Sequence, residues 1–317
     1  MDFIRDILAI PFGFALSLFY NLTDSYILAI ILLTVIIRCA LLPASISQQK
    51  NSAKQVRLQT KVNKIKQKYA GNQQKIQEET QALYQREGFG AANMGCMPLM
   101  IQMIVMIGLY GVIYTPLSSV LRFSNDTIEK IKTAMNIAVE ATGKNANEAR
   151  MVELKILENF EKFADKLSGV ISAEDMEALV GLKEKFQIFG LDLAETPTTK
   201  DPGLIWIIPI LAFLTAMMSS VYMYIRQRKQ NPEMAKNPSM GCMTFMSPFM
   251  SLVFTFMFPA GVGFYWVISN VLSFIQQVIL TNIYSPKKVI AQQMVDETVT
   301  RRSKENNTKR RVEIEKK

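Results

Sequence analysis

Hydrophobic residues gather in five long runs along the chain, and polar residues gather between these runs. The runs cover residues 25–42, 95–114, 204–225, 241–258 and 262–283. Each is 18 to 22 residues long, close to the roughly 20 residues that an α-helix needs to cross a bilayer core. Within them lies one ionisable side chain of the Asp, Glu, Lys or Arg type, Arg38. The pattern predicts an all-α membrane protein with five transmembrane helices.

The long connections between the runs predict smaller helical parts. Residues 43–94 have sparse apolar positions at helical spacing, with a break at Gly71-Asn72, and predict a charged helical hairpin. Residues 115–203 predict a helical loop, because apolar residues recur along one helical face. That face comprises Leu154, Ile156, Leu157, Phe160, Phe163 and Leu167. Residues 226–240 predict a short loop, and residues 284–317 predict a polar tail.

The first 24 residues are apolar from Ile7 to Tyr20 but contain Pro11 and begin with charged residues. A signal peptide begins with basic residues and ends at a small-residue cleavage site, and neither is clear here. We therefore predict an interfacial N-terminal helix over residues 1–24, lying on the outer face of the membrane. A spanning helix remains the alternative interpretation.

Charge alternates between the connections and predicts an orientation. The net charge is −2 over residues 1–24, +6 over 43–94, −4 over 115–203, +3 over 226–240 and +5 over 284–317. Basic loops stay in the cytoplasm, although long loops largely escape this rule. The pattern predicts a multi-pass protein of a bacterial plasma membrane, with its N-terminus outside and its C-terminus cytoplasmic.

Composition excludes several kinds of chemistry. There is no histidine, which excludes histidine metal sites and Ser-His-Asp triads. The three cysteines, Cys39, Cys96 and Cys242, have no spacing typical of a metal site or a disulfide framework. Neither a GxxxxGK[ST] loop nor a GxGxxG motif is present. We therefore expect no cofactor, no metal and no enzymatic reaction.

Arg38 is the residue that the membrane interpretation must explain, since a lone cation at mid-membrane costs about 2.5–3.5 kcal/mol on insertion scales. Two interpretations remain open. Arg38 lies five residues before Pro43, near enough to the inner end for its side chain to reach the interface. It could equally line a wet cavity open to the cytoplasm.

Polar side chains in the other runs favour the wet cavity. We select as candidate groove residues Arg38, Thr34, Gln102, Ser219, Ser220, Trp266, Asn270 and Ser273. Small polar groups in spans often form only hydrogen bonds between helices. Together with a cation that has no acidic partner in any run, they indicate water or a visiting polar or acidic chain.

Several stretches resemble the YidC/Oxa/Alb family of membrane protein insertases, in particular its five-span bacterial forms. They are AIILLTVIIRCALLPASISQQK at 29–50, ALYQREG at 82–88, GCMPLMIQM with GLY within 95–110, and FPAGVGFYWVISN followed by IQQ within 258–277. They follow the family's order and cover most of the chain outside the 115–203 loop and the tail. One departure is Ser219-Ser220, where the family often has Gln-Gln.

The resemblance implies an insertase and chaperone that inserts and helps fold newly made membrane proteins through a hydrophilic inner-leaflet groove. In the family the arginine that matches Arg38 lies in this groove, and the hairpin that matches 48–88 receives the substrate. The implied partners are nascent membrane proteins and membrane lipids. The Sec translocon and the ribosome are further candidate partners, the latter through the hairpin and the basic tail.

Competing interpretations remain at this stage. The hairpin fits a solvated connector as well as a docking arm, and the basic tail is typical of disorder near anionic lipid as well as of contact with RNA. A small-solute transporter is disfavoured, because the chain lacks the internal repeats typical of transporters. A structural anchor for a ribosome or another complex, acting through the hairpin and the tail, is the third functional hypothesis.

Overall fold

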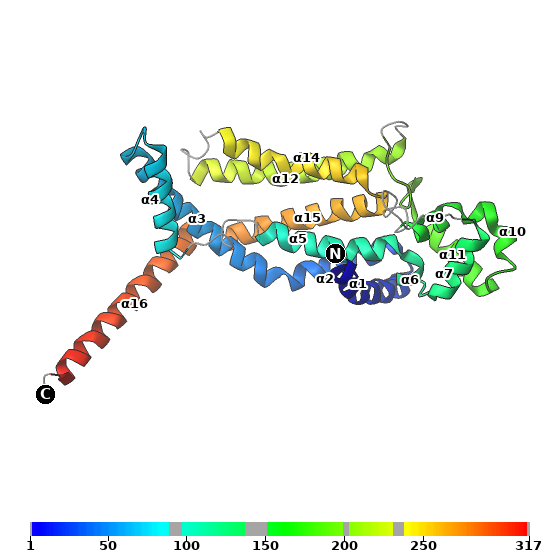
Figure 1. Cartoon of the computed structure of the whole chain (residues 1–317), viewed down its shortest axis with the longest axis horizontal. Helices are drawn as coiled ribbons and strands as arrows, with labels where there is room; N and C mark the ends of the chain where they lie inside the picture. The colour runs from blue at the N-terminus through cyan, green and yellow to red at the C-terminus, as the bar shows by residue number, and fades with distance from the viewer. Residues whose placement is uncertain (1, 89–96, 137–150, 199–202, 231–237, 316–317) are drawn as a thin grey trace. The chain divides into compact units, whose positions relative to one another are not determined.

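The structure is a computed structural model that describes residues 2–88, 97–136, 151–198, 203–230 and 238–315. In this part the chain is almost entirely helical, as predicted (Figure 1). It divides into two compact units. The first comprises residues 1–40 and 102–274, and the second comprises residues 41–101 and 275–317.

The first unit contains most of the long apolar helices. They are α1 (Asp2–Thr23), α2 (Tyr26–Ala40), α5 (Met97–Tyr114), α12 (Ile207–Gln230), α14 (Pro238–Met257) and α15 (Ala260–Ile283). The first residues of α5, up to Ile101, and the end of α15, from Ile275, belong to the second unit. α12 packs along α14, and α1 packs along α2. α1 buries Leu16, Ser17 and Tyr20 and exposes the apolar row Ile7, Ile10, Phe14, Leu18 and Leu22.

Glycines allow some of these helices to approach closely. An ideal Cβ on Gly108 of α5 would lie 2.7 Å from a ring carbon of Phe12. One on Gly263 of α15 would lie 2.6 Å from Cγ2 of Ile208. Real Cβ atoms essentially never make such short contacts, so a side chain at either position would force its neighbours to move.

A cap of short elements is inserted between α5 and α12. Its elements are α6 (Pro116–Ser119), α7 (Asn125–Ala134), α9 (Val152–Asn159), the 3-10 helix η3 (Phe160–Phe163), α10 (Ala164–Leu167), α11 (Ala173–Lys185), strands β1 (Gln187–Ile188) and β2 (Leu191–Asp192), and the 3-10 helix η4 (Leu204–Trp206). Ser124 and Ser172 cap the N-termini of α7 and α11 by accepting backbone hydrogen bonds.

The predicted apolar face forms a core of this cap. Leu154, Ile156, Leu157, Phe160 and Leu167 are buried, whereas Phe163 is half-buried. The β-hairpin is an addition to the all-α prediction, which took Gly190 only as a helix break. β1 and β2 pair antiparallel, with Ile188 opposite Leu191. Strands of two residues are too short to produce a recognisable alternation of hydrophobic and polar positions.

Contacts tie the cap to one end of the long helices in the first unit. Phe186 stacks on Tyr26 at the start of α2, with ring centroids 4.1 Å apart. The amides of Ala260 and Gly261, at the start of α15, donate to the carbonyls of Glu195 and Leu193 over 2.7 and 2.8 Å. Figure 1 shows the cap helices gathered at this end.

The second unit contains α3 (Leu42–Lys68), α4 (Gln73–Arg86) and α16 (Pro286–Glu315), together with the end of α15. The chain turns between α3 and α4 at Gly71, which has a φ of +92°, and Asn72 caps α4 by accepting from the amide of Lys75. α3 and α4 thus lie on either side of Gly71-Asn72, and the charged hairpin over residues 43–94 stays a prediction. α16 packs on α3, so the described tail is helical.

A helix is present at each of the five hydrophobic runs. Leu204–Lys229 and Ala260–Ile283 qualify as single membrane spans by length and composition within the described part. A third span results if α2 and α3 count as one broken span. The apolar stretches Ile7–Thr23, Met103–Tyr114 and Thr244–Met257 are shorter. Five crossings therefore stay a prediction.

Candidate functional site

Arg38 contacts α15 within the first unit. Its side chain is half-buried on α2, and its Nη2 donates to the backbone carbonyl of Ser269 over 3.3 Å and to the hydroxyl of the same serine. Ser269 is itself buried. Because both acceptors belong to one residue of α15, this contact fixes the direction of the guanidinium relative to the first unit.

Ser273 and Thr34 lie one helical turn from the two members of this contact. The hydroxyl of Ser273 donates to the carbonyl of Ser269 over 2.5 Å, so this carbonyl accepts from both Ser273 and Arg38. Thr34 is buried, and its hydroxyl donates to the carbonyl of Ile30 over 2.6 Å. The structure therefore places Ser273 beside Arg38 through Ser269, whereas the Thr34 hydroxyl bonds within its own helix.

Asn270 and Trp266 direct polar contacts to two other helices. The side-chain amide of Asn270 donates to the carbonyl of Ala212 over 3.2 Å and to the hydroxyl of Thr215 over 3.3 Å, both on α12. The indole N–H of Trp266 donates to the hydroxyl of Ser251 on α14 over 3.0 Å. Together with Ser269, these residues make α15 the helix that joins the polar groups of α2, α12 and α14.

We call Arg38, Thr215, Ser251, Trp266, Ser269, Asn270 and Ser273 the α15 polar cluster. Three of its members were missing from the predicted set: Thr215, Ser251 and Ser269. Thr215 and Ser269 are visible in the sequence as polar residues within hydrophobic runs. Ser251 is also a polar residue within a hydrophobic run. It accepts from the indole of Trp266, which needs an acceptor because it is removed from water.

The remaining predicted residues are not brought into this cluster. Ser219 is half-buried and Ser220 is buried on α12, and in the described part of the chain neither forms a hydrogen bond to Arg38 or α15. Gln102 lies in α5, and its side chain falls outside the described residues. The predicted groove set is therefore divided: Arg38, Trp266, Asn270 and Ser273 share contacts through α15, and Ser219 and Ser220 stand apart.

The second unit has a row of cations on one face of α3, which we call the α3 basic row: Lys50, Lys54, Arg57 and Lys61. Their spacing of four, three and four residues places them on one helical face. Lys54 donates to the carbonyl of Glu87 over 2.8 Å, and Lys61 pairs with the Glu87 carboxylate. Lys50 lies 5.5 Å from the ring centroid of Tyr284. The row thus contacts both the end of α4 and the start of the tail.

Arg57 forms the most specific contact of the α3 basic row. Its two Nη atoms donate to the two carboxylate oxygens of Glu297 on α16, over 2.8 and 3.0 Å. The hydrogen bond from Arg57 lowers the pKa of Glu297, and the same bond raises the pKa of Arg57. Glu297 is largely exposed, so this pair contributes little to stability and directs how α16 lies on α3.

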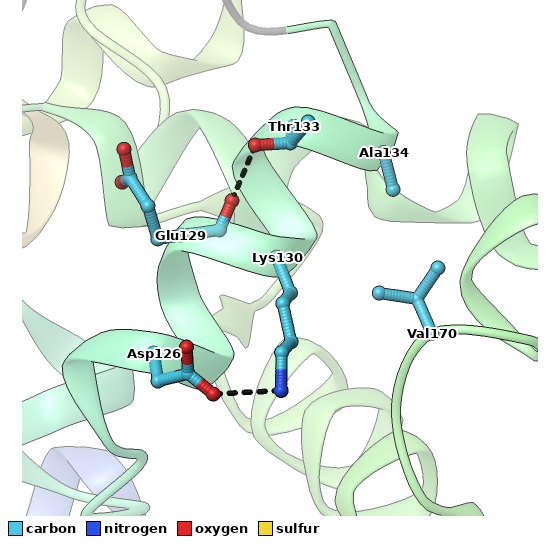
Figure 2. Close-up of a pocket in the computed structure, with 6 residues that line it drawn as sticks. All are labelled: Asp126, Glu129, Lys130, Thr133, Ala134 and Val170. Atoms are coloured by element: carbon cyan, nitrogen blue, oxygen red, sulfur yellow. Dashed lines mark hydrogen bonds and ion pairs between the residues drawn. The ribbon is translucent and has the colours of Figure 1, made fainter.

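A shallow hollow in the cap has no comparable polar convergence. It is lined by Asp126, Glu129, Lys130, Thr133, Ala134 and Val170 (Figure 2). Asp126 pairs with Lys130 over 2.6 Å, and Thr133 donates to the carbonyl of Glu129 over 2.8 Å. The Glu129 carboxylate pairs with Lys132 over 2.7 Å, so each charged or hydroxyl group of the lining has a partner on α7. Among the described residues no group of three or more Cys, Asp or Glu could hold a metal ion.

Comparisons with known proteins agree over most of the chain. The model of the family described as 60Kd inner membrane protein matches residues 18–288. The chain is similar to the membrane protein insertase MisCA of Bacillus subtilis, with 28% identity over 251 residues, or 78% of this chain and 67% of that protein. It is similar to the membrane protein insertase YidC 2 of Bacillus anthracis, with 26% identity over 275 residues, or 85% and 78%. It also resembles the membrane protein insertase YidC 1 of Listeria monocytogenes, with 24% identity over 283 residues, or 88% and 72%.

Proposed function

Because the chain belongs to the 60Kd inner membrane protein family, which is the YidC/Oxa/Alb family, we propose that it is a membrane protein insertase and chaperone. Its substrates are newly made membrane proteins, and it works in a bacterial plasma membrane. The observation that carries this proposal is the family match over residues 18–288. The apolar helices of the first unit, two of which could span a membrane alone, support it.

The proposed topology has five spans over 25–42, 95–114, 204–225, 241–258 and 262–283, with the N-terminus outside and the C-terminus in the cytoplasm. Alternating loop charge supports this orientation. The cap contacts the starts of α2 and α15, which is the same end that this topology assigns to the outside. Residues 1–24 then form an interfacial helix whose exposed apolar row faces lipid.

In the proposed mechanism, the polar segment of the substrate crosses part of the membrane through water instead of hydrocarbon. A polar segment that crosses hydrocarbon leaves backbone and charged groups unsatisfied, at several kcal/mol per group. A hydrophilic groove that reaches partway across the membrane shortens this path. In this proposal Arg38 attracts an acidic residue of the segment, and Ser269 holds the guanidinium in place.

The other cluster members then hold the helices around the groove. Asn270 joins α15 to α12, and Trp266 joins α15 to α14. Thr34, Gln102, Ser219 and Ser220 are proposed as further polar lining. The apolar segment of the substrate leaves sideways into lipid, and its transfer contributes about 25 cal/mol per Å² of apolar surface. No covalent bond is made or broken.

The proposed cytoplasmic parts are the hairpin over 43–94, the loop over 226–240 and the tail over 284–317. The hairpin receives the substrate, and the basic tail assists contact with the ribosome. The net charge of +6 over residues 43–94 supports a role in docking, because a basic surface attracts acidic partners. Cooperation with the Sec translocon is the other proposed partnership, alongside activity of the chain alone.

Proteoliposomes that contain only this protein test the proposal. A single-span substrate with an acidic N-terminal tail is added, and protection of the tail from protease is compared with empty liposomes. We expect protection above the blank, reduced by Arg38→Ala and less reduced by Arg38→Lys, which keeps the charge. The same substrate with a neutral tail should be less sensitive to Arg38→Ala.

Two further variants distinguish a loss of insertion caused by the groove residues from a loss caused by general destabilisation of the fold. Arg122→Ala removes an exposed arginine that bonds a serine, Ser17, in the same unit, and should leave insertion unchanged. Ser269→Ala should give a partial loss, because Arg38 keeps its charge and the backbone acceptor. Equal loss for acidic and neutral tails would refute the electrostatic role of Arg38. Loss of activity on removal of residues 284–317, with full activity of Arg38→Ala, would favour the anchoring hypothesis instead.

A further inference from the structure

The tip of the β-hairpin carries a fully exposed aromatic side chain. Phe189 is 96% exposed, and it lies in the two-residue turn between the paired residues Ile188 and Leu191. The residue that shares the turn is Gly190, so the tip carries no charge or hydrogen-bonding side chain. In water such a side chain orders solvent without compensation from packing.

The backbone at this tip is unfavourable for phenylalanine. Phe189 has a φ of +50°, and Gly190 has a φ of +80°. Positive φ at both central residues is typical of a type I′ turn, where Asn, Asp and Gly are preferred at the first position. A bulky aromatic residue in the left-handed region is uncommon. Local turn chemistry therefore does not explain this residue.

The hairpin that presents Phe189 is held firmly at its base. Lys183 is almost fully buried and pairs with Asp192 over 2.5 Å. The amide of Leu193 donates to the carbonyl of Phe186 over 3.0 Å, and Phe186 stacks on Tyr26 of α2. The tip is therefore a rigid projection rather than a loose loop, since its base is fixed by a buried ion pair, a backbone bond and aromatic packing.

The same base places the tip at the end of α12 and α15 that the proposed topology assigns to the outside. The carbonyls of Leu193 and Glu195 accept from the first amides of α15. β2 also lies against η4, which leads directly into α12, and α12 and α15 are the helices that could each cross a membrane alone. Trp206 of η4 is half-exposed, and tryptophan is typical of the membrane–water interface.

An apolar surface continues from the hairpin base down α12. Leu204 is 63% exposed, and it begins a row of exposed apolar side chains at helical spacing. The row comprises Leu204, Ile207, Leu211, Leu214, Met218, Val221 and Ile225. The tip lies four residues from Leu193, or about 13 Å of extended chain, whereas the headgroup layer is roughly 5–8 Å thick on each side of the hydrocarbon. The hairpin is therefore long enough to carry Phe189 through the headgroup layer from its anchored base.

We propose that Phe189 inserts into the outer leaflet of the bilayer and anchors the cap on the lipid surface. The occupant of this apolar tip is lipid, because the tip is uncharged and its base lies against η4, which leads into the exposed apolar row of α12. The insertion fixes the height of the cap above the membrane at the point where the chain enters the third proposed span.

Spin labelling of the full chain in liposomes tests this proposal. The native Cys39, Cys96 and Cys242 are replaced by serine, and a nitroxide is attached at Phe189→Cys. Oxygen concentrates in acyl chains and a nickel chelate stays in water, so the ratio of the two collision rates reports depth. We expect this ratio to be several-fold higher than at Val180→Cys, a matched control at an exposed valine, 41% accessible, on α11 of the same cap.

A second variant keeps an aromatic ring at the tip. Phe189→Trp, with Trp206→Phe and Trp266→Phe, should be quenched by lipids brominated near the headgroup end of their acyl chains. Val180→Trp in the same background should be quenched much less. Equal access of the nickel chelate to positions 189 and 180 would overturn the proposal. Exclusion of both oxygen and the chelate from position 189 would also overturn it, because it would indicate burial against protein.

Discussion

Glu153 offers the sharpest test of how the cap is held on the end of α5. The helix α6 begins with Pro116, which has no amide hydrogen, and the hydroxyl of its N-cap residue Thr115 donates back to Gly111. Glu153, from α9, supplies the missing acceptors. One carboxylate oxygen accepts from the amides of Leu117 and Ser118 over 2.7 and 3.0 Å, and the other accepts from the Ser118 hydroxyl over 2.8 Å.

Glu153→Ala removes all these acceptors at once. Leu117 is completely buried, so its amide loses its partner where little water can replace it. Each buried group left unsatisfied costs about 1–3 kcal/mol, and two amides therefore cost about 2–6 kcal/mol. Because Ser118 is only half-buried, we expect the lower part of this range. Glu153→Gln keeps one acceptor oxygen and should cost less.

Hydrogen exchange of peptides that cover residues 115–121 measures this loss in the membrane-reconstituted protein. A local loss of about 2 kcal/mol corresponds to roughly 30-fold faster exchange, since about 1.4 kcal/mol is a factor of ten. Peptides from α16, in the other unit, serve as the internal control and should not change. Unaltered exchange at residues 115–121 in Glu153→Ala would refute the capping role.

The pH dependence gives an independent check with a defined sign. Burial raises the pKa of Glu153 above its ordinary value, against the lowering effect of the hydrogen bonds from Ser118 and Leu117. Between the unfolded and folded pKa values the folded state then binds more protons than the unfolded state. Local stability is therefore highest at low pH and falls as pH rises through this window. Glu153→Gln should abolish this dependence, and a rise of stability with pH in the wild type would contradict it.

Three further changes have defined outcomes. Lys183→Met leaves Asp192 without its buried partner and should lower the stability of the cap by about 3–5 kcal/mol, measured by thermal unfolding. The control Lys185→Met breaks an exposed pair with Asp24 and should cost under about 1 kcal/mol. Gly263→Ala forces a Cβ against Ile208 and should lower the free energy of unfolding by about 1–3 kcal/mol. In a double-mutant cycle, Gly263→Ala with Ile208→Ala should lose less stability than the sum of the two single variants. Arg57→Ala should loosen α16 on α3, which a spin label at Val299 reports as faster motion. The control Arg301→Ala should leave this motion unchanged. Equal label mobility in both variants would show that the Arg57–Glu297 pair does not direct the packing.

The helical architecture was predictable from the sequence because its signal is long and repeated. Runs of apolar residues mark each long helix, and the break at Gly71-Asn72 lies between α3 and α4. The β-hairpin was not predicted, because two-residue strands leave no periodic pattern. The helical tail was also not predicted, since the polar composition of residues 284–317 is shared by disordered segments. Its packing on α3 depends on partners such as Arg57 that lie far away in the sequence.

The sequence predicted most residues of the candidate site but not which hydrogen-bond partner each of them takes. Arg38 and the polar residues of the fifth run stand out because polar groups in apolar runs need partners. The sequence does not state which partner each group takes. Ser251 gains its role only through the indole of Trp266, and Ser219 and Ser220 lie on α12 without joining Arg38. Side-chain pairing across helices depends on rotation and register, which hydrophobic patterns determine only to within a turn.

The bonds from the first amides of α15 to the carbonyls of Leu193 and Glu195 impose an order on biogenesis. The ribosome makes residues 115–203 before residues 260–261, so the base of the β-hairpin emerges before the donors that complete it exist. During synthesis those carbonyls have no α15 amides to accept from until synthesis has reached the last hydrophobic run. The cap therefore completes its bonds to α15 only after that point, and a chain truncated before Pro259 lacks the two amides that donate them.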